Sequence, residues 1–295
     1  MTANLLKGNL AAKEINSKLK LLMTKLRSDF KFPPSQLPKI ALIDCCLDIE
    51  SKLYIKKKKS TISEIGFSFQ EYIFQEYKKN ELINLINSLN HEKNMHGILV
   101  QLPIPVREDT EELINYIDPK KDIDGLTDVN MNKIKANDNS GIKSCAALGI
   151  LHLLKETQIN FKSAQFVLVG NGKLINYPLG LLLKHAYGAE KMEIVDINTE
   201  NSQEIIRKGD VVISATGVKH RIEEKFVKKG AVVVDCGSIN KKETEFDKLV
   251  NVASFITPIP GGVGPLTISY LMANVMKAFC LQNDINFSEE KICFF

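Results

Sequence analysis

The chain has 295 residues, enough for two domains that each bury a hydrophobic core. Its net charge of +4 at pH 7 is spread along the chain, so the composition favours no nucleic-acid-binding function, and no apolar run is long enough to span a membrane. Six cysteines without a C-x-x-C pattern, and the lack of a signal-peptide pattern, predict a cytoplasmic protein with reduced thiols.

The first half of the chain alternates helical and strand patterns. Apolar residues at helical spacing between Leu10 and Phe30 predict a long amphipathic helix, which ends before Pro33. Strands are predicted at Lys39–Asp44, Phe67–Phe74 and Gly97–Gln101, with helices at about 50–64 and 81–89 between them. This alternation predicts a parallel sheet wrapped by helices, in which functional residues gather at the carboxyl ends of the strands.

The second half, from about Thr127, continues the alternation. Strands are predicted at Gln165–Gly170, Met192–Asp196, Asp210–Ser214 and Ala231–Asp235. Gly170 and Gly172 allow a pyrophosphate to approach a helix N-terminus, as in a Rossmann fold, although Asn176 takes the place of the third glycine. Each strand taken alone could simply belong to a hydrophobic core. The four strands together predict a dinucleotide-binding sheet, with Ser214–Gly217 as a loop beneath the cofactor.

Tyr54 and Lys58 are the first pair of residues whose side chains could take part in substrate binding or catalysis. They lie four residues apart in a predicted helix and therefore share a face. An aromatic ring can stack on a flat substrate, and a partly buried lysine has a lowered pKa that suits proton transfer. The alternative is a solvated lysine, because Lys58 is one of four consecutive lysines, Lys56–Lys59.

Gln101 and Asp124 are the next candidates. Gln101 ends a predicted strand, because the prolines that follow it cannot continue the strand, and its amide can orient an amine or polarise a carbonyl. Asp124 closes the segment Asp118–Gly125 and can accept hydrogen bonds from a paired N–H donor. The alternatives are a glutamine that bonds to loop backbone and acids that form turns.

A proline- and glycine-rich stretch, Thr257–Thr267, precedes an apolar helix. Its prolines stiffen the loop, and its glycines leave backbone that a ligand can approach closely. Thr267 is predicted to cap the helix, whose free N–H groups then point at whatever the loop holds. The alternative is a simple connector between core elements.

Taken together, these motifs resemble the bifunctional methylenetetrahydrofolate dehydrogenase/cyclohydrolase family, over about residues 5–280. The resemblance implies oxidation of 5,10-methylenetetrahydrofolate with a nicotinamide cofactor, then hydrolysis of the methenyl product to 10-formyltetrahydrofolate. It implies that Lys58 is the catalytic lysine, that Tyr54 stacks on the pterin, that Gln101 tunes the lysine and that Asp124 holds the pterin edge. The implied folate-binding residues also include Val100, Leu102, Pro260, Gly261, Gly262, Val263 and Gly264.

The implied cofactor-binding residues are Gly170, Asn171, Gly172, Asp196, Ile197, Thr216, Gly217 and Ile239. Here the sequence departs from the family pattern. NADP is the family expectation, but the arginine and serine that suit a 2′-phosphate are replaced by Asn171 and Gly172. Asp196 can accept from a ribose 2′-hydroxyl and repel a phosphate, so a weakened NADP preference and use of NAD are predicted. The alternative is that Asp196 is a surface turn residue.

The sequence therefore predicts a two-domain α/β protein with a cleft between its domains. A catalytic domain at 1–126 is completed by a C-terminal helix at 266–295, and a Rossmann-like domain spans 127–265. The family implies a homodimer, and the histidine spacing suggests no metal site. Two alternatives remain: a cyclohydrolase with an impaired dehydrogenase, and a non-catalytic dinucleotide- or folate-binding protein. Another α/β dehydrogenase is disfavoured because no residue set suits an α-carboxylate.

Overall fold

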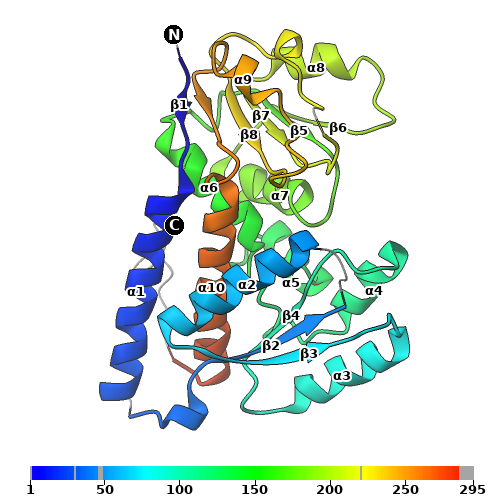
Figure 1. Ribbon diagram of the computed structural model, residues 1–295. Coiled ribbons are helices and arrows are strands. Elements are labelled where there is room, and N and C mark those ends of the chain that lie inside the picture. The colour runs from blue at the N-terminus through cyan, green and yellow to red at the C-terminus, as the bar shows by residue number, and fades with distance from the viewer. Residues whose placement is uncertain (1, 30, 46–48, 220, 286–295) are drawn as a thin grey trace. The chain divides into compact units, whose positions relative to one another are not determined.

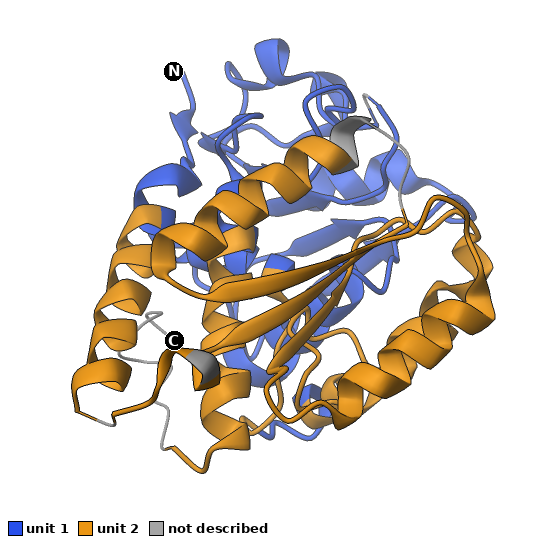
Figure 2. Cartoon of the chain, turned by 60° about the horizontal axis from the view of Figure 1, so that its bottom comes forward, with its two compact units in different colours: residues 1–12, 134–138, 146–267 blue, residues 13–133, 139–145, 268–295 orange. Residues whose placement is uncertain are grey.

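The computed structural model describes residues 2–29, 31–45, 49–219 and 221–285. The chain divides into two compact units (Figure 2). Unit 1 contains residues 1–12, 134–138 and 146–267, and unit 2 contains residues 13–133, 139–145 and 268–295. Two long helices, α1 (Gly8–Ser28) and α10 (Val263–Gln282), have residues in both units. Over the described ranges, no helix combines the length and the apolar character that crossing a membrane requires.

Unit 2 is built on a small parallel sheet whose strand order is β3-β2-β4. Its elements are β2 (Lys39–Asp44), α2 (Ile49–Ile65), β3 (Ser68–Ile73), α3 (Lys79–His91), β4 (Gly97–Val100), α4 (Thr110–Asn115) and α5 (Asp128–Lys135), the last two residues of which belong to unit 1. Helices α2 and α3 cover opposite faces of the sheet (Figures 1 and 2). Because both faces are covered, the central strand β2 has a continuous apolar run, Ile40–Ile43, between its charged end residues.

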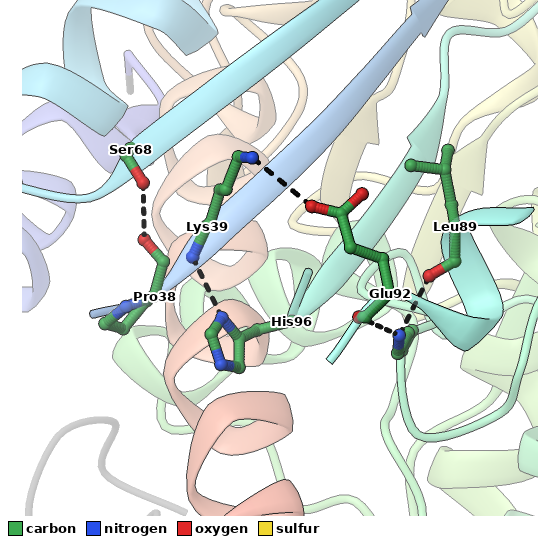
Figure 3. Close-up of polar contacts among 7 residues, drawn as sticks. Pro38, Lys39, Ser68, Leu89, Glu92 and His96 are labelled. Carbon is green, nitrogen blue, oxygen red and sulfur yellow. Dashed lines mark hydrogen bonds and ion pairs between the residues drawn. The ribbon is translucent and has the colours of Figure 1, made fainter. Parts of the chain in front are cut away.

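Figure 3 shows the amino-terminal edge of this small sheet. The backbone N–H of Lys39 donates to His96 Nδ1 at 3.2 Å, and the Lys39 amine contacts Glu92 at 3.4 Å. Lys121, which is buried, donates to the last carbonyls around the end of α3, namely those of Leu89, Asn90 and Glu92. These contacts hold β2, α3 and the start of β4 together. They lie at the amino ends of the strands, whereas Gln101 follows the carboxyl end of β4.

Unit 1 is built on a larger sheet, in which six described strands are parallel and ordered β1-β9-β8-β7-β5-β6. Its strands are β1 (Asn4–Leu5), β5 (Phe166–Val169), β6 (Met192–Val195), β7 (Val211–Ser214), β8 (Val232–Asp235) and β9 (Phe255–Ile256). Its helices are α6 (Cys145–Glu156), whose first residue Cys145 belongs to unit 2, α7 (Asn176–Tyr187), α8 (Ser202–Lys208) and α9 (Phe246–Leu249). The prediction of an α/β fold with parallel sheets is confirmed.

Each sheet has a point at which the strand order reverses. In unit 1 the chain runs from β5 outward to β6 and then returns to place β7 on the other side of β5. In unit 2 it runs from β2 to β3 and then places β4 on the other side of β2. Open α/β sheets bind ligands at the carboxyl ends of the strands where this reversal occurs. The topology therefore marks one ligand-binding edge in each unit.

Two details of the predicted helices are wrong. The final helix α10 begins at Val263, so Thr267 lies inside it and its hydroxyl donates to Val263 O at 3.2 Å instead of capping the helix. The helix can start this early because Pro265 falls in its first turn, where no backbone N–H is needed. Leu10, expected on the buried face of α1, is exposed, whereas Ile15 and Leu19 are buried. Phe30 lies outside the described residues.

Candidate functional site

Lys58 is buried in unit 2, with 5% of its surface exposed. Helical periodicity explains why it differs from the lysines beside it: α2 buries Ile55, Lys58 and Ile62 on one face, and Lys56 and Lys57 point to solvent. The Lys58 amine donates to Gln101 Oε1 at 2.9 Å and lies 4.8 Å from the centre of the Tyr54 ring. An amine, an amide and an aromatic ring therefore meet at one place.

Gln101 follows directly on β4, beside the end of β2, where the strand order of unit 2 reverses. Its backbone N–H donates to Ile43 O at 2.8 Å, which extends the sheet by one residue. Its side-chain Nε2 donates to Leu102 O at 2.7 Å, so the other amide atom, Oε1, is turned toward Lys58. The amide is thus held at both ends. Val100 is buried, and Leu102 is partly buried.

Asp124 lies beside the same strand end. Asp122 forms a parallel bridge with Ile98, and continuing that register places Asp124 level with Val100. The Asp124 carboxylate accepts a hydrogen bond from the thiol of Cys145 at 2.9 Å. By contrast, Asp122 is fully buried and accepts from the backbone of Gly125 and Thr127, so it stabilises the turn that presents Asp124.

The predicted cofactor residues of unit 1 follow the carboxyl ends of four neighbouring strands, β8, β7, β5 and β6. After β5, Gly170 has φ of +99°, and a Cβ there would lie 2.6 Å from Ala215 O, so only glycine fits. Asn171 and Gly172 are exposed, and open space surrounds the position of a Cβ at Gly172. The turn then enters α7, whose N-terminus suits an anionic group.

The turn after β6 contains Asp196 and Ile197. Asp196 Oδ1 accepts from the backbone N–H of Asn198 at 2.9 Å and from the hydroxyl of Thr199 at 3.0 Å. Asp196 is therefore a turn residue whose carboxylate also has a fixed orientation at the strand end. Ile197 is 94% exposed.

The loops after β7 and β8 contain the remaining predicted cofactor residues. Thr216 and Gly217 donate their backbone N–H groups to the carboxylate of Glu243, at 2.8 and 2.7 Å. Ile239, in the loop after β8, is exposed.

The predicted folate loop, Pro260–Gly264, belongs to unit 1 and runs from the connection after β9 into the first two residues of α10. Gly261 has φ of +110°, and its carbonyl accepts from the N–H of Gly8 at 2.8 Å. A Cβ on Gly8 would lie 2.3 Å from Gly262 O, so bare backbone at both positions lets the loop pack on the start of α1. Pro260 and Gly264 are exposed, and Val263 is buried.

Three residues with no predicted role prove to contact the candidate sites. Cys145 bonds to Asp124, and Glu243 bonds to the loop after β7. Asn176, in the place of the third glycine, donates to Val169 O at 2.9 Å and Gly170 O at 2.8 Å, which holds the end of β5 and the nucleotide turn together. The unusual residue type at position 176 is a visible signal in the sequence, whereas no motif in the sequence marks Glu243.

The fold and these sites define a class: a two-unit α/β protein with a buried lysine–glutamine pair on one parallel sheet and a nucleotide-type turn on the other. Two models of the tetrahydrofolate dehydrogenase/cyclohydrolase family match the chain, the catalytic domain at residues 6–124 and the NAD(P)-binding domain at residues 144–283. The chain belongs to this family, and the predicted resemblance is confirmed.

Individual relatives agree over nearly the whole chain. The bifunctional protein FolD of Acetivibrio thermocellus is 36% identical over 92% of this chain and 98% of its own length. The crystal structure of the bifunctional FolD enzyme from Campylobacter jejuni is 30% identical, with a TM-score of 0.85, and the match covers 94% of this chain and 98% of that chain. The Trypanosoma brucei FolD structure, complexed with NADP and an inhibitor, is 27% identical, with a TM-score of 0.86 and coverage of 95% and 98%.

Proposed function

We propose that the chain oxidises 5,10-methylenetetrahydrofolate to the 5,10-methenyl cation with NAD(P)+ and then hydrolyses the cation to 10-formyltetrahydrofolate. The observation that carries this proposal is the buried contact between Lys58 and Gln101 in a chain whose two halves match the two domains of the family. Relatives named as bifunctional enzymes support both activities.

Hydrolysis of the methenyl group requires a base beside an electrophilic carbon. The product of oxidation is a cation, so a protonated amine next to it would repel it. Lys58 acts either in its neutral form, which takes a proton from the attacking water, or through a proton shared with Gln101. Gln101 holds the amine in position through its fixed Oε1.

Folate binding is assigned to the residues around this pair. Tyr54 stacks on the pterin, and its ring already faces the amine at 4.8 Å. Asp124 accepts hydrogen bonds from the pterin edge, with its carboxylate held by Cys145. Val100 and Leu102 flank the strand end, and the family resemblance assigns folate binding to Pro260–Gly264 as well.

The residues of unit 1 fit a dinucleotide. The turn at Gly170–Gly172 offers backbone next to the N-terminus of α7, and Thr216, Gly217 and Ile239 lie at neighbouring strand ends. When bound, the nicotinamide supplies a hydride acceptor. The role of the chain is to hold the folate and the dinucleotide in reacting geometry.

Cofactor preference follows from charge at the end of β6. Asp196 places a fixed carboxylate where the ribose of a dinucleotide lies in such folds, and Asn171 and Gly172 supply no cation for a 2′-phosphate. We therefore infer that the preference for NADP is weakened and that NAD is used.

A second candidate function is favoured by the same altered turn. A cyclohydrolase with an impaired dehydrogenase would keep Lys58, Gln101 and Asp124 and lose efficient cofactor use. The family also leads us to expect a homodimer through the nucleotide-binding domain, which sedimentation of the purified chain would test. Cytoplasmic localisation stays a prediction.

One absorbance assay tests these proposals. Methenyltetrahydrofolate formation is followed with NAD and with NADP, and decay of added methenyltetrahydrofolate is followed separately, in the wild type and in Lys58→Met. We expect both activities in the wild type, no large advantage of NADP in kcat/KM, and a loss of hydrolysis of about a hundredfold or more in Lys58→Met. Lys57→Met, which changes an exposed neighbour, is the control. Unchanged hydrolysis in Lys58→Met rules out the proposed base.

A further inference from the structure

We propose that Glu243 is a positioning residue for the dinucleotide cofactor, because its buried carboxylate holds the Ser214–Gly217 loop in the conformation that the cofactor contacts. This inference rests on the proposed function. Glu243 lies in the connection between β8 and α9, with 1% of its surface exposed.

The carboxylate of Glu243 accepts hydrogen bonds from one short loop. Ser214 donates its hydroxyl at 2.6 Å, and Thr216 donates both its hydroxyl and its backbone N–H at 2.8 Å. Gly217 donates its backbone N–H at 2.7 Å. Every hydrogen bond that the structure gives this carboxylate, within the described ranges, comes from these three residues. Bonds from several donors to a charged acceptor are short and strong, so they hold the loop in one conformation.

The loop lies where a ligand is expected. Ser214 ends β7, which pairs with β5 at the point where the strand order of unit 1 reverses. A Cβ on Gly170 would lie 2.6 Å from the carbonyl of Ala215, so this loop forms one wall of the nucleotide turn. Any shift of the loop therefore changes the shape of the turn that receives the pyrophosphate.

Glu243 is itself held by a second carboxylate. Asp235, which ends β8 and is buried, accepts from the backbone N–H of Glu243 at 3.0 Å and from the N–H and hydroxyl of Thr244 at 2.9 and 2.7 Å. Asp235 pairs with Ser214 across the two strands. The two acids thus link the ends of β7 and β8 through one chain of hydrogen bonds.

Burying the Glu243 carboxylate carries a large desolvation cost, which stabilising the loop alone would not require. Burying a carboxylate requires that nearly all of its hydration be replaced, and here loop N–H and hydroxyl donors replace it without an ion pair among the hydrogen bonds to its oxygens. The benefit is a rigid cofactor wall, because preorganised groups need not be ordered when the ligand binds. Glutamine at this position has the same shape, but its NH2 group would face an N–H or hydroxyl donor.

The test compares Glu243→Gln with Glu245→Gln, which removes a partly exposed acid two residues away that contacts Lys248 and the backbone N–H of Glu224. NADH and NADPH binding are titrated by fluorescence, and both enzymatic activities are measured. We expect the cofactor Kd and KM of Glu243→Gln to rise roughly 10- to 100-fold, with kcat at saturating cofactor changed far less. Hydrolysis of methenyltetrahydrofolate should stay within about twofold, because Lys58 and Gln101 belong to unit 2. Glu245→Gln should bind cofactor like the wild type.

A folded Glu243→Gln variant with unchanged cofactor Kd overturns the inference. If that variant fails to fold, Ser214→Ala removes one donor and keeps the acid; an increase of about three- to tenfold in Kd supports the inference, and an unchanged value overturns it. A wild-type chain that binds dinucleotide but shows neither activity contradicts the proposed function alone. Both activities in the wild type, with normal cofactor binding in Glu243→Gln, contradict this inference alone.

Discussion

At the scale of single residues, burial separates chemically active side chains from identical neighbours. Lys58 is turned inward against Gln101 and Tyr54, whereas Lys56 and Lys57 of the same run face solvent. The segment Asp118–Gly125 shows the same contrast between two acids. The Asp122 carboxylate accepts hydrogen bonds within its own turn, whereas the Asp124 carboxylate accepts one from the side chain of Cys145, in another element. The local partner thus decides which of several similar residues can serve the substrate.

Cys145 should act through Asp124. Removing its thiol in Cys145→Ala takes away the donor 2.9 Å from the carboxylate, which then has more freedom. In the role proposed for Asp124, it would therefore bind the pterin less well. We expect the folate KM to rise about three- to tenfold, with kcat nearly unchanged. Cys145→Ser keeps a donor and should stay close to the wild type.

Steady-state kinetics of both activities check this expectation. Cys280→Ala, which removes another buried free thiol, is the matched control and should leave the folate KM unchanged. A wild-type KM in Cys145→Ala would show that the thiol does not position the acid.

At the scale of elements, the carboxyl-terminal part of α10 supports the candidate active site of unit 2. Asn274, which is buried, donates to Ile123 O at 2.8 Å and to Lys143 O at 2.9 Å. Those carbonyls adjoin Asp124 and the start of the segment that carries Cys145. Lys277 likewise donates to the carbonyls of Asn139 and Gly141. One helix thus holds two loops whose side chains meet.

Replacing Asn274 by leucine should therefore affect both stability and binding. Two carbonyls lose their donor, and we expect the free energy of unfolding to fall by about 2–4 kcal/mol and the folate KM to rise. Urea denaturation and steady-state kinetics measure the two effects. Asn283→Ala removes an exposed amide, directly after α10, that donates to Phe279 O, and should change stability by less than about 1 kcal/mol. Equal stability of the two variants would contradict this role for α10.

At the scale of the whole molecule, buried titratable groups make stability depend on pH. Burial, together with nearby Lys121 and Lys39, lowers the pKa of His96 to about 4. Its Nδ1 accepts from the Lys39 backbone, as Figure 3 shows, and a protonated ring could not accept this bond. The folded chain therefore keeps His96 neutral where an unfolded chain would protonate it.

Proton uptake by His96 in the unfolded state sets the sign of the pH effect on stability. Between about pH 6.5 and pH 4 the unfolded state binds a proton that the folded state excludes, so the free energy of unfolding falls as pH falls. The decrease in the free energy of unfolding that His96 causes is about 3 kcal/mol in total, and there is no such decrease at neutral pH. Urea denaturation at pH 7, 5.5 and 4 should show a weaker pH dependence in His96→Asn, which keeps an acceptor for Lys39. Parallel pH profiles of the two proteins would contradict this expectation.

The sequence by itself determined the alternation of strands and helices, because residues buried on both faces of a parallel sheet form continuous apolar runs such as Phe166–Val169. It also determined the family, because motifs such as Gly97–Gln101 with the prolines that follow it, and Thr257–Thr267, are long enough to be specific. It did not show where α10 begins, since Pro265 fits either a loop or a first helical turn.

Only the tertiary structure decided which distant residues meet. Glu243 and Ser214 are 29 positions apart, and Asn274 and Ile123 are 151 apart, so no local pattern relates them. Likewise, the short β1 is a strand only because it pairs with β9, near the other end of the chain. Local spacing specifies elements through the periodicity of apolar side chains, whereas the pairing of buried polar groups depends on how those elements pack, and that packing sets the partners of Lys58, Asp124 and Glu243.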